Sequence, residues 1–224
     1  MPQPKRIGVF GGAFDPPHNT HAALIELALA QLQLDQLRVI PTGQAWHKAR
    51  PLSPAADRLA MAGLAFSTLP GVVVDARETQ RAGPSYTVDT LRELQQENPD
   101  AELVLLIGGD QARALPTWHR WQEILRYATI CVADRADQTG ARGTFDPLNQ
   151  ANAVKSGLES VSGALSEGFS GYPSGARFLR LQMPLSPVSA SDIRARVAAR
   201  QSIDSLVCEP VARYIVDHHL FQTD

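Results

Sequence analysis

The run Gly11–His21, GGAFDPPHNTH, brings together residue types that suit the binding of a phosphate group. It follows a short apolar stretch and precedes a long apolar helical pattern, so it lies where a strand passes into a helix. Glycines let a backbone approach a ligand closely, and N–H groups at a helix N-terminus favour an anion. His18 and His21 stand three residues apart, so at a helix start they share one face. The run therefore predicts a phosphate site with two imidazoles beside it.

Two familiar nucleotide motifs are absent from this run. No Gly-Lys-Ser/Thr follows the glycines, as in a P-loop, and the G-x-G-x-x-G spacing of a dinucleotide-binding turn is missing. Solvated cap residues or a metal pair would also place two histidines here, but no third His or Cys ligand stands nearby. Together with Gly11, Gly12 and Asp15, the two histidines favour a catalytic role.

A second helix start, close to the C-terminus, also carries residues that suit phosphate. In Ser189–Arg194, SASDIR, Ser189 and Asp192 have the spacing of a capping box, with Asp in place of the usual Glu or Gln. Two serine hydroxyls, helix N–H groups and the planar fork of Arg194 suit a polyphosphate. A capped amphipathic helix with an exposed arginine has the same pattern, so this run alone does not decide between the two interpretations.

Four more segments carry residues that suit a nucleotide. Lys48 follows the second predicted strand and could neutralise phosphate charge, and Thr87 opens a predicted helix whose N–H groups suit a carboxylate. Asp110 follows the central predicted strand, where α/β folds bind ligands, and suits ribose hydroxyls. Trp118 could stack on a flat ring, whereas Trp121 is expected in the core. A solvated lysine and an ordinary helix cap are the alternatives for Lys48 and Thr87.

Alternating apolar runs and helical patterns supply the elements that must hold these residues. Strand, helix, strand between Ile7 and Pro41 is a βαβ unit, which implies a parallel sheet. The predicted fold is α/β, a doubly wound parallel sheet with helices on both faces, in a single domain spanning residues 1–224. Strands are expected at 7–10, 37–41, 72–76, 103–107, 128–133 and 178–182, and helices at 20–34, 54–66, 87–97, 191–200 and 210–220.

One segment departs from this alternation. Residues 134–175 are rich in Gly, Ser and Ala and show no clear periodicity. A long surface loop or an insertion within the single domain is expected there.

Composition limits the classes of function. The chain has 224 residues, with 21 basic and 23 acidic side chains and a net charge of -2, so no broad nucleic-acid surface is expected. No apolar run approaches the roughly 18 residues of a membrane span, and the first is too short for a signal peptide. Cys131 and Cys208, the only cysteines, lie in apolar sequence and are expected as free buried thiols. The chain is expected in the cytoplasm, with no membrane or nucleic-acid partner.

The motifs resemble those of a known superfamily. The run Gly11–His21 is similar to the GG-x-FDP-x-H-x-GH signature of nucleotidyltransferases, which move an adenylyl or cytidylyl group onto a phosphate or related acceptor. Thr20 stands where the signature usually has glycine, which leaves both histidines in register. Ser189–Arg194 resembles the C-terminal I-S-S/T-x-x-R element, and Pro41–Lys48 resembles a P-x-x-x-P-x-H-K loop without its usual prolines. The SYT, IGGD and LPTWHRW segments resemble the bacterial nicotinate-mononucleotide adenylyltransferases.

This resemblance implies a Rossmann-like fold and transfer of AMP from ATP to nicotinate mononucleotide, giving nicotinate adenine dinucleotide and pyrophosphate. Mg²⁺ is implied on the ATP phosphates, held mostly by water and phosphate oxygens rather than by protein ligands. Catalytic roles are implied for His18, His21, Lys48 and Arg194. Substrate contacts are implied for Gly11, Gly12, Ala13, Phe14, Tyr86, Thr87, Gly108, Asp110, Trp118, Ser189, Ser191 and Ile193.

Other interpretations stay open at this point. A related adenylyltransferase would use another acceptor, such as nicotinamide mononucleotide or phosphopantetheine. A nucleotide-binding module without turnover would keep the fold, although the two intact histidines argue against it. A relative of class I tRNA synthetases should carry a tRNA-binding domain and a basic surface, which this sequence lacks. The oligomeric state, monomer or homodimer, does not follow from the sequence.

Overall fold

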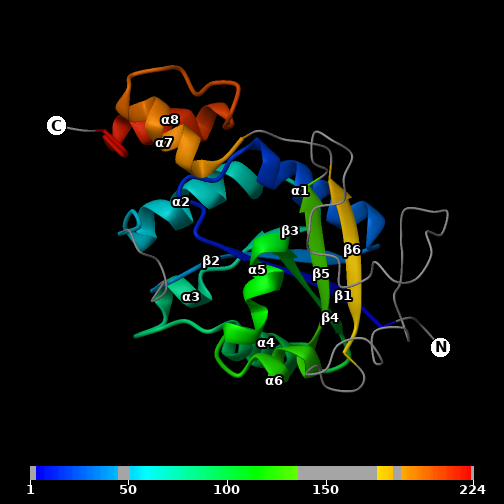
Figure 1. Cartoon of the computed structure of the whole chain (residues 1–224). Helices are drawn as coiled ribbons and strands as arrows, with labels where there is room; N and C mark the ends of the chain where they lie inside the picture. Colours follow the sequence, from blue (N-terminus) through cyan, green and yellow to red (C-terminus); the bar gives the residue numbers. More distant parts are fainter. Residues whose placement is uncertain (1–3, 45–50, 136–175, 184–187, 223–224) are drawn as a thin grey trace. The chain divides into compact units, whose positions relative to one another are not determined.

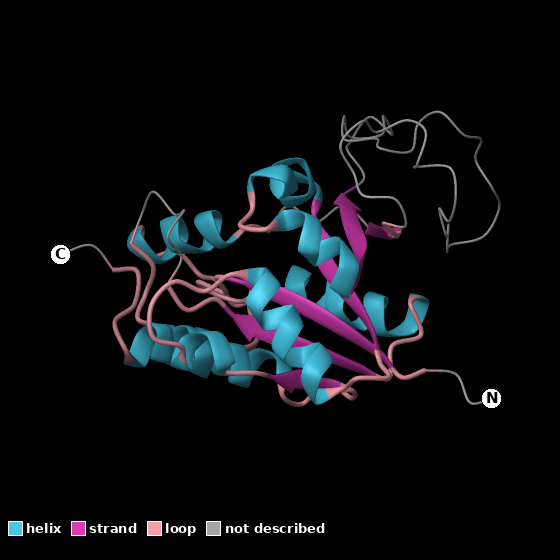
Figure 2. Cartoon of the chain, turned by 90° about the horizontal axis from the view of Figure 1, so that it is seen from below, coloured by secondary structure: helices cyan, strands magenta, loops and turns pink. Residues whose placement is uncertain are grey.

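A six-stranded parallel sheet flanked by helices forms the frame of the protein (Figures 1 and 2). The computed structural model describes residues 4–44, 51–135, 176–183 and 188–222. The strands lie in the order β3-β2-β1-β4-β5-β6. Successive strands run outward from β1 on one side and from β4 on the other, which is the doubly wound arrangement. The predicted α/β fold is confirmed.

The chain divides into two compact units. The first comprises Met1–Phe10, Leu27–Gln36 and Tyr86–Leu185, and the second comprises Gly11–Glu26, Leu37–Ser85 and Ser186–Asp224. The chain passes back and forth between them, so each unit is built from segments that are far apart in sequence. Strand β1 (Arg6–Gly12) begins in the first unit and ends in the second.

Parallel strands dominate the first unit. Its central strand β4 is apolar from Leu103 to Ile107, and all five of these residues are buried. A strand covered on both faces needs such a continuous run, which is why the sequence signal was clear. Phe10 of β1 pairs with Leu106, Leu103 pairs with the start of β5, and Phe178 of β6 pairs with Ile130. The remaining strand bounds are β4 (Glu102–Gly108), β5 (Ala128–Arg135) and β6 (Phe178–Met183).

The helices of the first unit follow β3 and β4 in the chain. Helix α4 (Thr87–Glu97) begins and ends where the sequence predicts, and it packs against α6 (Figure 1). Asn98 ends α4 by donating from its side chain to the Leu94 carbonyl at 3.0 Å. The shorter elements are α5 (Gly109–Ala114), the 3₁₀ turn η1 (Leu115–Thr117) and α6 (Trp121–Tyr127).

The second unit holds two strands and the helices on either side of them in the chain. Helix α1 begins in this unit, and α7 and α8 are its C-terminal elements. The elements are α1 (Asn19–Gln31), β2 (Gln36–Pro41), α2 (Ala55–Phe66), β3 (Val72–Val74), α3 (Arg77–Gln80), α7 (Ala190–Ala198) and α8 (Glu209–Asp217).

A small apolar core joins the C-terminal helices to α2, and Figure 1 shows α7 and α8 beside α2. Full burial of such side chains stabilises by roughly 1.5–3 kcal/mol each, so this core is enough to fix the start of α7 in place. The buried members are Met61, Ile193, Ile203, Val207, Val211 and Ile215.

The structure differs from the sequence prediction at element ends and in the short helices α3, α5 and α6, which were not predicted. Helix α2 begins at Ala55 rather than at 54, and its N-cap Pro54 makes no side-chain cap bond. Strand β5 extends to Arg135, two residues into the segment predicted as a loop from 134; residues 136–175 of that segment lie outside the described residues. Trp121, expected in the core, is half-buried.

Two further sequence expectations concern thiols and membranes. Cys131 is free and buried, whereas Cys208 is free but only half-buried, because α8 leaves it near the surface at its N-cap. Within the described ranges, no helix has both the length and the apolar character needed to cross a membrane.

Candidate active site

The loop that follows β1 turns its carbonyl groups into the protein. The Gly12 carbonyl accepts a hydrogen bond from the Thr42 amide at 2.8 Å, and the Ala13 carbonyl accepts one from Arg58 Nη1 at 3.0 Å. The Asp15 carbonyl accepts one from Arg194 Nη1 at 2.7 Å. Three carbonyls within four residues are thus bound from the protein side, which fixes the course of the loop.

Phe14 is the bend of this loop. Its backbone has a positive φ of 47°, unusual for a residue other than glycine and costing roughly 1–3 kcal/mol. Its ring is buried and meets Phe66 and His21 edge to face, with centroid distances of 5.6 and 5.2 Å. A Cβ on Gly12 would lie 3.0 Å from the Phe14 ring, so glycine is needed there to let that ring fold back.

His18 and His21 form a stacked pair. Their ring centroids are 3.7 Å apart and the rings are 18° from parallel. The His18 amide donates to His21 Nδ1 at 3.2 Å. Because Nδ1 accepts, a neutral His21 carries its proton on Nε2 and can donate only from there. The three-residue spacing therefore fixes the direction in which His21 can donate, and the His18 ring stacked on it supports that position.

The amides at the start of α1 are largely engaged by the chain itself, which differs from the sequence expectation. The Asn19 amide donates to the Leu206 carbonyl at 2.9 Å, and the His21 amide donates to the His18 carbonyl at 2.8 Å. The His18 amide is used by the imidazole described above. The α1 start is thus closed by the segment before α8, and an anion near it would depend on the preceding Gly11–Phe14 loop.

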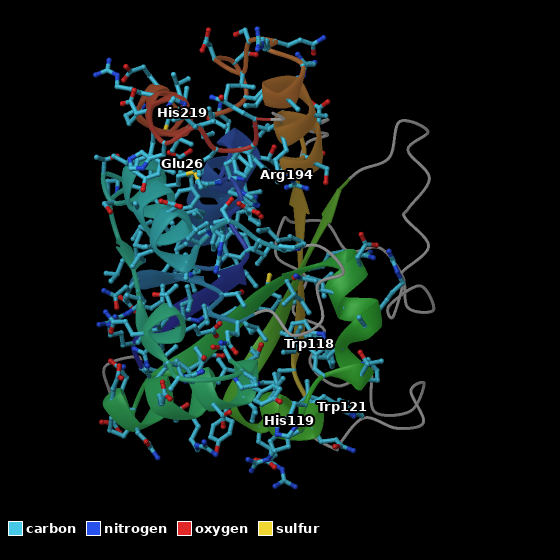
Figure 3. The ribbon with its side chains drawn as sticks, turned by 90° about the vertical axis from the view of Figure 1, so that its left-hand side faces the viewer. Glu26, Trp118, His119, Trp121, Arg194 and His219 are labelled. Carbon is cyan, nitrogen blue, oxygen red and sulfur yellow. The ribbon has the colours of Figure 1, made fainter. Side chains whose placement is uncertain are left out.

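The Ser189–Arg194 motif contacts the Gly11–His21 motif, and both belong to the second unit. Ser189 caps α7, accepting from the Asp192 amide at 3.1 Å as its spacing predicts. Arg194 projects from α7 (Figure 3), and its guanidinium holds both the Asp15 carbonyl and the Ser191 hydroxyl, the latter at 3.0 Å. The structure therefore brings together two motifs separated by 179 residues.

Ile193, implied as a substrate contact, is a core residue. Its side chain is fully buried in the apolar core around α2 and α8, and its amide donates to the Ser189 carbonyl at 3.1 Å. The side chain and the amide of Ile193 therefore both hold α7 in place. The neighbouring Arg196 pairs with Asp192 one turn away at 3.2 Å, as expected for a surface side chain.

The remaining predicted residues belong to the first unit, at the start of α4 and after β4. Thr87 is the first residue of α4, and the preceding Tyr86 stacks on His119 with ring centroids 4.2 Å apart. Asp110 is almost fully exposed and pairs with Arg113. Trp118 follows η1, half-buried, next to His119 (Figure 3). No role was predicted for His119. The only indication in the sequence was its place in the LPTWHRW segment, Leu115–Trp121, which resembles the family.

Lys48 lies outside the described residues, so its predicted place beside the phosphate stays a prediction. Gly108, at the end of β4, makes a hydrogen bond through its amide to the Gln111 side chain at 3.4 Å. A Cβ at Gly11 or at Gly108 would meet nothing within 4 Å, and neither position has a left-handed backbone. Packing within the chain therefore does not require glycine at these two positions, whereas close approach of a ligand would.

Comparison with known proteins decides the family. The sequence profile of the cytidylyltransferase-like family matches residues 9–196. A protein of Albidiferax ferrireducens named "Probable nicotinate-nucleotide adenylyltransferase" is 59% identical over 98% of this chain and 99% of its own. A protein of the same name from Methylibium petroleiphilum is 39% identical over 97% and 92%. The chain belongs to the nicotinate-nucleotide adenylyltransferases. The resemblance found in the sequence motifs is confirmed.

Solved structures of this adenylyltransferase type share the fold. The Plasmodium falciparum nicotinic acid mononucleotide adenylyltransferase complexed with NaAD superposes with a TM-score of 0.70 at 14% identity, covering 97% of each chain. The same enzyme complexed with APC gives a TM-score of 0.68. At this identity the likeness supports the Rossmann-like architecture and nothing finer.

The sequence motifs do not include Arg58, a buried charged residue of this adenylyltransferase chain. Arg58 faces inward from α2 and binds the Gly11–Phe14 loop through the Ala13 carbonyl, yet it belongs to none of the motifs. The available signal was its place on the apolar face of α2, three residues before Met61, where a charged side chain needs buried partners.

Proposed function

We propose that this chain transfers AMP from ATP to nicotinate mononucleotide, forming nicotinate adenine dinucleotide and pyrophosphate. Membership of the family supports the reaction, and one structural observation supports it at the level of the site: the hydrogen bond from Arg194 to the Asp15 carbonyl. That bond holds the fork of a phosphate-binding arginine against the loop that carries the two histidines. A helix cap with a merely exposed arginine would have no reason to make it.

The acceptor phosphate binds the backbone of Gly11–Phe14. Three carbonyls around this loop are turned toward protein donors, so the loop keeps one conformation without help from a ligand. The bare Gly11 allows a phosphate to approach the backbone. Positioning of this kind accounts for a large share of catalysis when two substrates must meet.

His18 and His21 donate hydrogen bonds to the ATP phosphates as negative charge develops on the transferred and leaving groups. His21 donates from Nε2, because its Nδ1 is occupied by the His18 amide. Two imidazolium rings stacked at 3.7 Å would repel one another, so the pair suits neutral donors rather than paired cations. Lys48, Ser191 and Arg194 hold the triphosphate, and Lys48 and Arg194 supply the positive charge.

The reaction needs no covalent enzyme intermediate. A phosphate oxygen of the mononucleotide attacks the α-phosphorus of ATP, and the bond from that phosphorus to the oxygen bridging the β-phosphate breaks. Pyrophosphate leaves with the electron pair. The protein contributes alignment and stabilisation of the developing charge.

Mg²⁺ enters with ATP in this proposal. In the part of the chain that the structure describes, no group of three or more His, Cys, Asp or Glu side chains is arranged to hold a metal. Mg²⁺ keeps most of its waters and takes phosphate oxygens as ligands, so it needs few protein ligands. When bound there, the ion offsets phosphate charge.

The first unit carries the residues that we assign to the nucleoside parts of the substrates. Tyr86, Thr87 and Trp118 select the pyridine ring and its carboxylate, and Asp110, beside Gly108, orients ribose. The stack of Tyr86 on His119 supports this assignment, because it holds an aromatic face at the start of α4. Asp110 would have to share or release Arg113 in order to bind ribose.

We further propose that residues 1–224 act as one nucleotidyltransferase domain in the cytoplasm. Neither compact unit contains all the assigned residues, and β1 contributes to both.

A pyrophosphate-release assay tests the proposed function. The purified full chain is incubated with ATP, Mg²⁺ and each of three acceptors: nicotinate mononucleotide, nicotinamide mononucleotide and phosphopantetheine. The highest kcat/KM is expected with nicotinate mononucleotide. Faster turnover of another acceptor would reassign the substrate, and absence of pyrophosphate with all three would favour a binding module.

A further inference from the structure

Arg58 is a buried cation that binds three separate segments of the second unit. Its side chain is only 2% exposed. Nε donates to the Ser53 carbonyl at 3.0 Å, Nη1 to the Ala13 carbonyl at 3.0 Å and Nη2 to the Gly43 carbonyl at 3.2 Å. The loop after β1, the loop after β2 and the segment before α2 therefore meet at one guanidinium.

The charge of Arg58 is balanced inside the protein. Burial lowers the pKa of Arg58, and the nearby carboxylates of Asp15 and Glu78 act in the opposite direction. Both acids are themselves buried, at 2% and 7% exposed. Arginine stays protonated in proteins, so Arg58, Asp15 and Glu78 form an internal cluster of charges. Arg58 is thus suited to holding backbone groups in place rather than to attracting an anion.

The geometry of the peptide bond transmits the position of Arg58 to the other side of the loop. The Ala13–Phe14 peptide is trans, since Asp15–Pro16 is the cis bond of the described chain. In a trans peptide the C=O and N–H groups point in opposite directions. With the Ala13 carbonyl held by Arg58, the Phe14 N–H points away from the guanidinium. Thr42 does the same for the preceding peptide by holding the Gly12 carbonyl.

We propose that Arg58 is a positioning residue for the acceptor phosphate, acting through the Ala13–Phe14 peptide. It fixes the direction of the Phe14 N–H within the Gly11–Phe14 loop. This inference rests on the proposed function, which gives that loop the phosphate of nicotinate mononucleotide. Arg58 itself does not touch the substrate.

Lysine is the informative replacement. Arg58→Lys keeps a positive charge beside Asp15 and Glu78, but a compact ammonium on a different stem lacks the planar fork that reaches three carbonyls at once. The variant should fold, and the loop should lose its fixed direction. Arg58→Gln, which keeps an N–H donor without the charge, serves as the second variant if the lysine variant does not fold.

Arg6→Lys is the matched control. Arg6 is a half-buried arginine of the first unit that donates to the Leu32 carbonyl and pairs with Glu102 at 3.1 Å. Its partners Leu32 and Glu102 lie outside the Gly11–Phe14 loop, so its replacement removes comparable contacts without removing one to that loop. Both lysine variants should melt at a lower temperature than the wild type.

Steady-state kinetics separate positioning from stability. For Arg58→Lys, we expect KM for nicotinate mononucleotide to rise about tenfold, the size of one lost hydrogen bond to a charged group, with KM for ATP within threefold of wild type. Arg6→Lys should keep both KM values. A merely structural role would reduce the active fraction, which lowers the apparent kcat and leaves KM unchanged.

The outcomes distinguish this inference from the proposed function. If wild type releases no pyrophosphate with nicotinate mononucleotide, the proposed function fails. If wild type is active and Arg58→Lys keeps its KM, or raises both KM values equally, the positioning role alone is overturned. A wild-type NMR titration covers the case in which neither Arg58 variant folds. Nicotinate mononucleotide should then shift both the Phe14 amide and the Arg58 Nε resonances, and unshifted resonances would contradict the role.

Discussion

The two histidines of the motif differ in their surroundings although they look alike in sequence. His18 is 5% exposed and gives its amide to its neighbour, whereas the His21 ring is half-buried between the His18 ring and the edge contact with Phe14. These two ring contacts restrict rotation of the His21 side chain. A donor that is already oriented loses little freedom when charge develops on a phosphate, and this is the physical basis of its catalytic value.

His21→Ala should therefore lower kcat by about 10²–10³, the typical effect of removing one transition-state donor. His219→Asn provides the control, because His219 is exposed, has a positive φ of 52° and Asn tolerates that backbone. Pyrophosphate release measures both variants. Turnover of His21→Ala close to that of the control would remove the catalytic role.

Thr87 tests the acceptor side. As the first residue of α4, it offers a hydroxyl where a helix start favours a carboxylate. Thr87→Val keeps the shape and removes the hydroxyl, so KM for nicotinate mononucleotide should rise by more than KM for ATP. An unchanged KM for the mononucleotide would exclude Thr87 from the acceptor site.

Among the elements, short helices were hardest to predict. Continuous apolar strands such as β4 and a capped, amphipathic helix such as α4 have strong local signals. Helix α3 has four residues and α6 has seven, too short for periodicity or for stability on their own. Their positions depend on contacts that the sequence does not display, such as the ion pairs of Asp75, which follows β3 directly.

Asp75 connects β2, β3 and α3 through its carboxylate. It accepts from the Arg77 amide at 3.0 Å and pairs with Arg77 at 2.8 Å and with Arg38 at 3.3 Å. Burial alone would raise the pKa of Asp75, but the hydrogen bonds and charge of Arg77, with a smaller contribution from Arg38, lower it overall. A carboxyl whose pKa is lowered by folding stabilises the fold above its unfolded value, and that stability is lost as pH falls through its folded value.

Asp75→Asn should accordingly lower the free energy of unfolding by roughly 1.5–3 kcal/mol at pH 7, the range for hydrogen bonds to charged groups. The difference from wild type should shrink as pH falls from the unfolded value, about 4, through the lower folded value of Asp75, because wild-type Asp75 then also loses its charge. Urea unfolding at several pH values measures this, with the exposed Asp204→Asn as control. A destabilisation that is equal at pH 7 and pH 3 would contradict the ionic explanation.

For the whole molecule, the fold could be predicted from the sequence, but the packing of the site could not. Local patterns identified the parallel sheet, and the motifs singled out the histidines and Arg194 as candidates for the site. The bond from Arg194 to Asp15 crosses 179 residues, and no periodicity reports such a pairing. Arg58 was missed for the same reason: its three carbonyl partners come from segments that only the folded chain brings together.

The thiol of Cys131 is a probe of the first unit. Cys131 lies in β5 of the first unit, fully buried, and burial raises the pKa of its thiol to about 12. Since the thiolate is the reactive form, Cys131 in a Cys208→Ser variant should react with a thiol reagent at pH 8 roughly a thousandfold more slowly when folded than in urea. Rapid labelling of the folded variant would contradict this.

The contact between the Gly11–His21 run and α7 can form only late in the synthesis of the chain. The Asn19 side chain binds the Ser205 carbonyl at 3.1 Å, across 186 residues, and Arg194 holds Asp15. A ribosome adding 5–20 residues per second needs roughly 10–40 s to make the stretch between such partners. During that time the histidine loop exists without the groups that close it. A nascent chain stalled before α7 should therefore already contain the GGAFDPPHNTH run and still be inactive, until the last helices emerge.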